Sequence, residues 1–410
     1  MSVYEDVKLE GHIIDSLVLP VVLDDILDLG GDFRFLSFRV GREKKDRSRA
    51  VLRVGAPDDV LLERIITRIQ RHGAEAVDAE SVVLEPAPAD GVFPEGFYST
   101  TNLETFIRLD GRWLPVSFPE MDCGIRVRIG EGLTPPQAET VALFDVRRGD
   151  LLVVGRKGLR VVPLERPRAA TSFEFMSSSV SSEKPKRLVL GEVARLMRAT
   201  HENGQKILAV AGPAVVHTGA AQALGRLVHA GWIDVIFGGN AVAVHDLEAS
   251  MYGTSLGINI EHGYAVEGGH EHHLRAINRI RGCGGIRQAV EEGVVTGGLF
   301  FEVIRKGIPF VLAGSIRDDG PLPDVITDAM QAQRAMRAHT RTAGMCLLLS
   351  TMLHSIATGN LLPASVHTVC VDINPAVVTK LADRGSWQTI GIVTDIGLFL
   401  GELARELGET

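Results

Sequence analysis

The sequence predicts an α/β protein whose largest part, residues 187–410, forms a doubly wound parallel sheet. Apolar runs of strand length alternate there with helical patterns, and each run ends in a loop rich in Gly, Asn, Ser or Asp. The five clearest strand–loop–helix turns are Ala209–Gly219, Val235–Asp246, Phe310–Asp324, Leu347–Ser355 and Val369–Val378. The loops of such a sheet gather at one edge, where α/β folds bind ligands.

A small α+β module is predicted ahead of this domain, in residues 1–90. Phe33–Gly41 alternates with a period of two and indicates a strand, and Ser48–Ala56 indicates a second one. Asp58–Gly73 has apolar residues at helical spacing, with Asp58 as a candidate N-cap. This order of elements suggests a ferredoxin-like or regulatory-type sandwich.

Residues 91–170 are richer in Gly and Pro, and their short strand patterns indicate a β-rich barrel or sandwich region. Asp110–Gly111 is a hairpin turn signal within it. Residues 171–186 are rich in Ser and predict a linker, although Ser177–Ser179 could instead form a phosphate-binding loop.

Composition limits the classes of protein. At 410 residues the chain is too long for one core. Its formal net charge of -8 argues against a nucleic-acid partner or an acidic membrane surface. The first residues lack a signal-peptide pattern and no apolar run can span a bilayer, so we expect a cytoplasmic protein. The four cysteines have no paired spacing, which favours reduced thiols over metal or disulfide sites, and Cys346 and Cys370 lie within apolar strands as core residues.

The strand ends indicate a nucleotide site, although no G-x-G-x-x-G motif follows a strand. Gly282–Gly285 comes closest to that motif but follows a helical pattern. A helix N-terminus after a parallel strand can still offer its N–H groups to a pyrophosphate. The tightest such turn is Gly238–Asn240, where Asn240 either caps the helix or holds a ribose or amide. Thr351–His354 follow another strand and either cradle phosphate or begin the next helix with a cap.

Two acids at strand ends are candidates for cofactor contacts. Asp372 ends an apolar strand, where a carboxylate suits the hydroxyls of an adenosine ribose and favours NAD over NADP. The alternative is a helix cap, because Asn374 and Pro375 begin the next helix. Asp395 has the equivalent place after the following strand and either faces the cofactor or caps.

The loop Ser315–Asp324 is the most polar of the domain. One or two of its carboxylates, Asp318 and Asp319 among them, could take an ammonium group or a proton, although a solvated loop has a similar composition. His217 and His245 each follow a strand and turn, and they either line the site or are structural.

The stretch His270–His273 does not predict a metal site. The motif H-E-x-x-H fails because Leu274 stands where the second histidine is needed. Adjacent residues on a helix also diverge by about 100° and cannot converge on one ion. His270 or His273, together with Arg275 and Asn278, better fits a polar helix start that binds a substrate carboxylate.

Six segments carry a resemblance to a known family: GPAVVHTG, GNAVAVHD, FVLAGSIRDDGPLPD, STMLHS, VDINPAVVTKLADRGS and GIVTDIGLF. They resemble the archaeal-type ornithine cyclodeaminases and the C-terminal region of the cyanobacterial bifunctional arginine dihydrolase/ornithine cyclodeaminases. LEGHIIDSLVLPVVLDDILDLGG is similar to the conserved region named after lysine-oxoglutarate reductase/saccharopine dehydrogenase. The resemblance covers nearly the whole chain and does not imply arginine hydrolysis, because the extra catalytic domain has no counterpart.

The resemblance implies a Rossmann-related, deoxyhypusine-synthase-like NAD domain, in agreement with the missing glycine motif. It implies cofactor contacts at Asn240, Ala241, Asp319, Thr351, Met352, Leu353, His354, Asp372, Asp395 and Ile396. The implied reaction converts L-ornithine to L-proline and ammonia. A hydride leaves Cα for NAD⁺, the δ-amine displaces ammonia at that carbon, and the hydride returns. This sequence is redox-neutral, so the cofactor stays bound.

For that reaction we expect Asp318 to bind the amine or transfer a proton, and Arg275 to bind the substrate carboxylate. His217 and Lys380 are alternatives for proton transfer, although Lys380 could simply lie on the helix that follows Asp372. A lysine cyclodeaminase, an amino-acid dehydrogenase and a non-enzymatic sensor of NAD or an amino acid are the competing interpretations. We expect a homo-oligomer that acts on a small amino acid.

Overall fold

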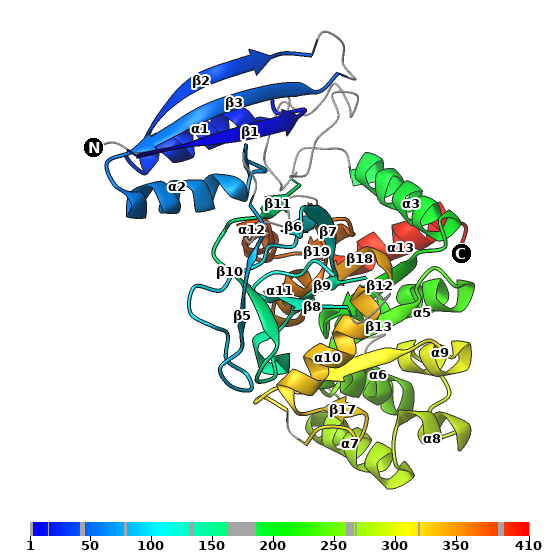
Figure 1. Ribbon diagram of the computed structural model, residues 1–410. Coiled ribbons are helices and arrows are strands. Elements are labelled where there is room, and N and C mark those ends of the chain that lie inside the picture. The colour runs from blue at the N-terminus through cyan, green and yellow to red at the C-terminus, as the bar shows by residue number, and fades with distance from the viewer. Residues whose placement is uncertain are drawn as a thin grey trace. The chain divides into compact units, whose positions relative to one another are not determined.

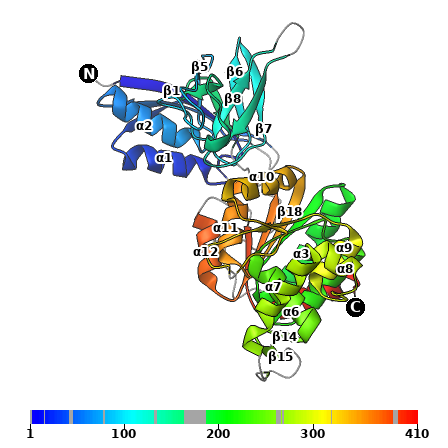
Figure 2. The same cartoon turned by 90° about the horizontal axis from the view of Figure 1, so that it is seen from below.

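The computed structural model describes residues 3–14, 16–41, 46–77, 80–130, 135–162, 186–259, 266, 269–318, 320–383 and 389–409. The chain forms two compact units, Met1–Ser177 and Ser178–Thr410, whose elements are drawn in Figures 1 and 2. The predicted linker, apart from its last residue, and the alternative phosphate loop at Ser177–Ser179 lie outside the described residues. No described helix is both long enough and apolar enough to cross a membrane.

The N-terminal unit begins with the predicted α+β module. Its elements are β1 (Val3–Gly11), α1 (Val18–Asp28), β2 (Asp32–Arg39), β3 (Ser48–Ala56), α2 (Asp59–Gln70) and β4 (Glu75–Ala76). The strand order β2-β3-β1-β4 and this succession of elements are those of a ferredoxin-like fold. Leu9 of β1 and Leu52 of β3 are buried in one cluster with Ile26 of α1 and Ile65 of α2. The period-two pattern of β1 and β3 therefore marks the face that the helices cover.

The β-rich region of the same unit is one seven-stranded sheet. Its strands are β5 (Val83–Pro86), β6 (Thr105–Leu109), β7 (Arg112–Ser117), β8 (Gly124–Arg128), β9 (Gln137–Val141), β10 (Leu151–Val154) and β11 (Leu159–Val161). They lie in the order β11-β6-β7-β9-β8-β10-β5. The predicted Asp-Gly turn joins β6 to β7, and Asp110 and Gly111 have φ values of 48° and 76°. Positive φ at both residues is what a type I′ hairpin turn requires.

The C-terminal unit is the predicted doubly wound domain. Its strands are β12 (Lys206–Ala211), β13 (Val235–Gly239), β14 (Thr254–Ser255), β15 (Ile258–Asn259), β16 (Phe310–Ala313), β17 (Val325–Ile326), β18 (Ala343–Leu349), β19 (His367–Asp372) and β20 (Thr389–Val393). Its α-helices are α3 (Lys186–Glu202), α4 (Ala214–His217), α5 (Ala221–Ala230), α6 (Asn240–Tyr252), α7 (His272–Cys283), α8 (Ile286–Glu291), α9 (Leu299–Lys306), α10 (Ala329–Thr340), α11 (Met352–Leu361), α12 (Pro375–Asp383) and α13 (Ile396–Leu407). Seven strands form one parallel sheet in the order β17-β16-β13-β12-β18-β19-β20.

Both faces of this sheet are buried, as the continuous apolar strands predict. Ile207 and Ala209 of β12 belong to the core shared with α3, α5, α9 and α13, whereas Leu208 faces the opposite core, shared with α10 and α12. Figure 1 shows these helices along the sheet. Cys346 and Cys370 are buried free thiols in β18 and β19, so the prediction that they are core residues is confirmed.

One buried carboxylate joins two helices of the C-terminal unit. Asp246 of α6 is 1% exposed, and its two oxygens accept hydrogen bonds from the first amides of α9, Leu299 N at 2.9 Å and Phe300 N at 2.8 Å. The residue before α9, Gly298, provides no side-chain cap, so Asp246 caps this helix from another element. Burial raises the pKa of Asp246 to about 6, and the two amide hydrogen bonds oppose that effect.

We predict that Asp246→Ala lowers the free energy of unfolding by about 3 kcal/mol, because it leaves two buried amides without an acceptor. Asp328, which caps α10 by accepting from Gln331 N at 2.8 Å, provides the control. Asp328→Ala should cost about 1 kcal/mol, as for an ordinary N-cap. Denaturant unfolding followed by tryptophan fluorescence measures both. Equal losses for the two variants would contradict the role given to Asp246.

Candidate nucleotide and substrate site

The order of the strands reverses at β12, which lies between β13 and β18. The loops after β12 and β18 meet there through their backbones, since Gly212 N donates to Leu349 O at 2.9 Å. A Cβ atom on Gly212 would lie 2.0 Å from Ser350 O, so no other residue type fits. Ser350 itself has a φ of 50°, in the left-handed region that non-glycine residues rarely adopt. Such a reversal is where doubly wound sheets bind ligands.

The N-terminus of α11 lies directly after this contact. Its N-cap, Thr351, has extended backbone angles and makes no side-chain capping bond. Met352 and Leu353 follow as the first helical residues and are 38% and 64% exposed. The first amides of a helix have no partner within the helix and carry its positive dipole end. The sequence left two alternatives for this helix start, a phosphate site or a capped helix. Among the described residues, the structure shows no side-chain cap there.

His354 is the side chain on which three strand ends converge. A Cβ on Gly239, at the end of β13, would lie 2.7 Å from Cε1 of its ring. The ring hydrogen-bonds the Ala313 carbonyl at the end of β16, and its Nδ1 lies 3.5 Å from Thr351 Oγ1. Burial lowers the pKa of His354, although the Ala313 hydrogen bond and the Asp318 charge oppose this effect. The surroundings of the ring therefore favour the neutral imidazole.

Asn240 joins the turn after β13 to the acidic loop. It is 4% exposed, and its Oδ1 accepts from Leu322 N at 3.0 Å. The N-cap of α6 is Gly239, so the alternative in which Asn240 caps its own helix is wrong. Ala241 follows in the first turn of α6 and is exposed. The cofactor contacts predicted for Asn240 and Ala241 stay predictions.

The acidic loop divides its carboxylates between two tasks. Asp324 Oδ2 accepts from Ile286 N at 2.9 Å and thereby caps α8, so this acid is structural. Asp318 Oδ2 accepts from Ser315 N at 2.8 Å and stays half-buried, with its charge acting on His354. Asp319 lies outside the described residues. Asp318 is thus the described acid of this loop that faces the converging strand ends.

Two different residues after β19 serve as the helix cap and as the candidate ribose ligand. Asn374 caps α12 by accepting from Ala376 N at 3.0 Å, so Asp372 is not needed for that task. Asp372 is 8% exposed, and its Oδ1 accepts from Asn374 N at 2.8 Å. Within the described part of the chain, its Oδ2 accepts no hydrogen bond. The carboxylate is therefore held in place with one oxygen unused.

The other two candidates beside this edge have defined neighbours. Asp395 caps α13 by accepting from Leu398 N at 2.9 Å, and Ile396 after it is buried as the first residue of that helix. Lys380 extends from α12 until its Nζ lies 4.0 Å from Met352 Sδ, at the start of α11. The lysine thus lies beside the uncapped helix N-terminus.

A second polar group is centred on Glu248, which the sequence did not single out. Glu248 is fully buried, and its carboxylate accepts from Thr254 Oγ1 at 2.9 Å and from the amides of Leu256 and Gly257, each at 3.1 Å. Its Oε2 lies 3.4 Å from His245 Nδ1. The spacing of His245 and Glu248, three residues apart on one helix, was the available signal.

His217 joins this group from the turn after β12. Its ring lies 4.8 Å from that of His245, and its Nδ1 is 2.7 Å from Ser255 Oγ. Burial lowers the pKa of His217, His245 lowers it further, and the Glu248 charge raises it. His272 completes the group, with its Nδ1 2.8 Å from Thr254 Oγ1. Three histidines from separate elements thus surround the β14 strand.

Arg275 is not brought into this group. It lies on the exposed face of α7, and its guanidinium donates to Glu271 Oε2 at 3.0 and 2.5 Å. The side chain of His270 lies outside the described residues. Among the described residues no three His, Cys, Asp or Glu side chains are arranged to hold a metal ion.

Comparison with known families covers almost the whole chain. Residues 191–403 match the family described as arginine dihydrolase ArgZ-like, C-terminal, Rossmann fold. Residues 104–190 match the first region of the same C-terminal part, and residues 4–103 match the LOR/SDH bifunctional enzyme conserved region. The predicted Rossmann-type domain is thereby confirmed.

Individual proteins agree with these matches. The ornithine cyclodeaminase of Methanopyrus kandleri is 53% identical over 98% of this chain and 97% of its own length. The crystal structure of apo ArgZ, a cyanobacterial arginine dihydrolase, is 40% identical with a TM-score of 0.86, over 100% of this chain and 58% of that chain.

A further crystal structure holds two ligands. It is the ternary complex of AgrE with ornithine and NAD⁺, 42% identical with a TM-score of 0.54, over 100% of this chain and 58% of that chain. AgrE is the bifunctional arginine dihydrolase/ornithine cyclodeaminase of Nostoc sp.. The matched regions and the full-length relatives show that the chain belongs to the ornithine cyclodeaminase family, which is similar in sequence to the C-terminal part of the ArgZ-like arginine dihydrolases.

Proposed function

We propose that this protein is an NAD-dependent ornithine cyclodeaminase, a lyase that converts L-ornithine to L-proline and ammonia. The observation that carries the proposal is the convergence of three strand ends on His354, with the uncapped α11 beside it. Relatives named ornithine cyclodeaminase match this chain over nearly their whole length, which supports the same activity. The AgrE complex with ornithine and NAD⁺ supports the choice of ligands.

The described residues fit NAD at the point where the strand order reverses. The open amides of α11 would take the diphosphate, and Gly212 allows the backbone the close approach that the loops need. The free Oδ2 of Asp372 would accept from a ribose hydroxyl. Lys380, beside the start of α11, would add a positive charge there. When bound, NAD supplies a hydride acceptor that afterwards becomes the hydride donor.

The chain itself must manage the protons of ornithine, which carries two ammonium groups at neutral pH. A neutral imidazole suits the removal of one of these protons, and burial favours the neutral form of His217. In the tautomer that carries its proton on Nδ1, His217 would donate to Ser255 Oγ, 2.7 Å away, and Nε2 would be the acceptor. Asp318 would hold an ammonium group through its carboxylate. Glu248 does not touch substrate in this scheme but positions His245 and the β14 strand.

Arg275 stays the proposed partner of the substrate carboxylate. Its bond with Glu271 is solvent-exposed, with the two side chains 62% and 47% exposed. Exposed ion pairs contribute only about 0–1 kcal/mol, so exchange of Glu271 for a substrate carboxylate costs little. The planar guanidinium would bind that carboxylate with two hydrogen bonds.

The central prediction is that purified protein forms equimolar proline and ammonia from L-ornithine with catalytic NAD⁺ and no net NADH. Product analysis together with absorbance at the NADH wavelength measures this. Protein stripped of NAD should be inactive until NAD⁺ is added. Net NADH during turnover would favour an amino-acid dehydrogenase, and NAD binding without turnover would favour a sensor. L-Lysine, tested as a competing substrate, should react more slowly than L-ornithine.

Asp372→Asn should lower the affinity for NAD⁺ about tenfold, because the amide offers the ribose a weaker acceptor than the carboxylate does. Asp395→Asn is the matched comparison. Asparagine keeps the cap on α13, so affinity should change less than about threefold. Titration calorimetry on both variants measures the effect. If Asp395→Asn lowers the affinity for NAD⁺ as much as Asp372→Asn does, Asp395 also contacts the cofactor.

The dependence of kcat on pH should report the protonation of His217. His245→Gln removes a group that lowers the pKa of His217, so the acid limb of the profile should move to higher pH. Glu248→Gln removes a charge that raises this pKa, so the limb should move to lower pH. His229→Gln, at an exposed position on α5, is the control. Shifts in the same direction, or none, would exclude His217 as the proton acceptor.

A further inference from the structure

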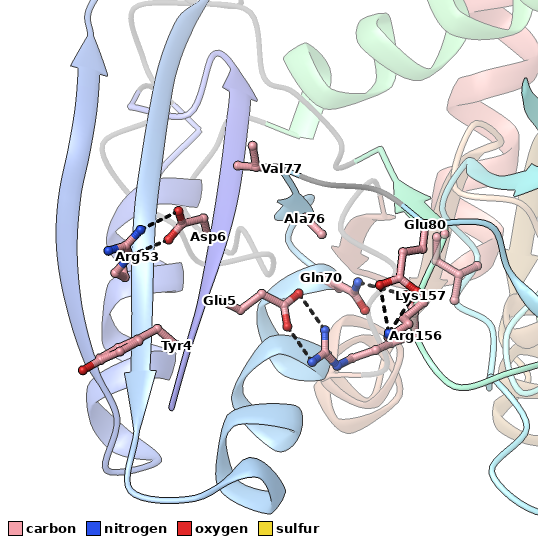
Figure 3. Close-up of a pocket in the computed structure, with 12 residues that line it drawn as sticks. Tyr4, Glu5, Asp6, Arg53, Gln70, Ala76, Val77, Glu80, Arg156 and Lys157 are labelled. Atoms are coloured by element: carbon pink, nitrogen blue, oxygen red, sulfur yellow. Dashed lines mark hydrogen bonds and ion pairs between the residues drawn. The ribbon is translucent and has the colours of Figure 1, made fainter. Parts of the chain in front are cut away.

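A second candidate site lies wholly in the N-terminal unit. It is a pocket of about 530 Å³ between β1, the end of α2, the residues after β4 and the turn that joins β10 to β11 (Figure 3). Its polar lining comes from these four elements and from Arg53 of β3, and its apolar lining includes Val77 and Leu159. None of these residues belongs to the parallel-sheet domain.

The pocket is lined by charged side chains in equal numbers of each sign. Arg156 donates two hydrogen bonds to Glu5, at 2.9 and 2.7 Å. Lys157 Nζ lies 3.0 Å from each carboxylate oxygen of Glu80. The third pair joins neighbouring strands, with Arg53 donating to Asp6 at 2.8 and 2.9 Å. Figure 3 shows Glu5 with Arg156 and Glu80 with Lys157 on one side of β1, and the Asp6–Arg53 pair between β1 and β3.

Arg156 is held in place before any ligand binds. Gln70, at the end of α2, donates from Nε2 to the Arg156 carbonyl at 3.2 Å. The turn that carries Arg156 and Lys157 is packed tightly against the segment that precedes β5. A Cβ on Gly158 would lie 2.5 Å from Val82 N, and the φ of 69° at this position also requires glycine. The two cations are therefore presented by a rigid turn.

Gln70 contributes a side-chain carbonyl oxygen, Oε1, that can accept a hydrogen bond from a ligand. Its side chain is only 5% exposed and lines the pocket, and within the described part of the chain its Oε1 has no hydrogen-bond partner. A buried amide oxygen without a donor is costly. The pair of Glu5 and Arg156 is also largely buried, with exposures of 24% and 16%. Pairs of this kind contribute little net stability to a fold, so exchange of one partner for a ligand group of the same charge costs little.

From these observations we propose that the pocket binds a free α-amino acid of zero net charge. The ligand carboxylate would meet the Arg156 guanidinium and the Lys157 ammonium group. The ligand ammonium group would meet Glu5 or Glu80 and could donate to Gln70 Oε1. The balance of charge in the pocket disfavours anions and cations alike, because either would leave a wall charge uncompensated. This inference does not rest on the proposed catalytic function.

The test is hydrogen–deuterium exchange of the full chain with L-valine and with L-proline. Either amino acid should slow exchange in Val3–Gly11 and in Arg156–Leu159, which report this pocket alone. Isobutylamine and isovalerate, which are valine without its carboxylate and without its ammonium group, should protect neither segment. No protection by either amino acid, or equal protection by these two analogues, would overturn the proposal.

Variants locate the binding by a second route. Lys157→Gln alters a side chain that is 57% exposed, so the fold should survive, and affinity should fall about tenfold. Arg156→Gln combined with Glu5→Gln should abolish binding without leaving an unpaired buried charge. Arg147→Gln removes an exposed arginine of the same unit that does not line the pocket and should change nothing. Calorimetry with the same amino acids that shows full affinity in both pocket variants would place the ligand elsewhere.

Discussion

The C-terminal unit depends on one backbone contact, that between the loops after β12 and β18. Gly212 approaches Ser350 so closely that a Cβ would lie 2.0 Å from a carbonyl oxygen. This contact sets the positions of two chain segments that leave the sheet in opposite directions. One leads to His217 through α4, and the other leads to the open N-terminus of α11. The segments that carry the candidate base, His217, and the candidate anion site, the start of α11, therefore both begin at this contact.

Buried polar groups around this point are satisfied from distant elements. Asp246 caps α9, Asp324 caps α8, and Asn240 holds the acidic loop through Leu322. Each of these side chains accepts a hydrogen bond from at least one buried amide. Its removal would leave that amide without an acceptor and would destabilise the fold. By contrast, the N-cap residue of α11 makes no side-chain capping bond, and the N-cap residues of α5, α6 and α7 make none either. What distinguishes α11 is its position at the reversal of strand order, where its first amides are open to a ligand.

Charge is used differently in the two units. In the C-terminal unit, Glu248 is fully buried and accepts three hydrogen bonds, so its charge orders a strand and a histidine. In the N-terminal unit, the charges around the pocket are paired with one another, and a glutamine oxygen beside them has no donor among the described residues. The hydrogen bonds of Glu248 are made within the protein. The paired charges around the pocket can instead exchange their partners for the charged groups of a ligand.

The sequence by itself determined the main strands of the parallel domain and its candidate ligand-binding edge, because hydrophobic periodicity and turn chemistry are local. It also identified the helix starts, yet it left the tasks of their polar residues open. Only the tertiary structure decided that Asn374 caps α12, that Asp372 Oδ2 accepts no hydrogen bond from the described residues, and that Asp395 caps α13. The role of Glu248 and the pairing of Glu5 with Arg156, which are 151 residues apart, were decided there too. The physical reason is that a side chain's partner across the fold leaves no periodic signal in the sequence around either residue.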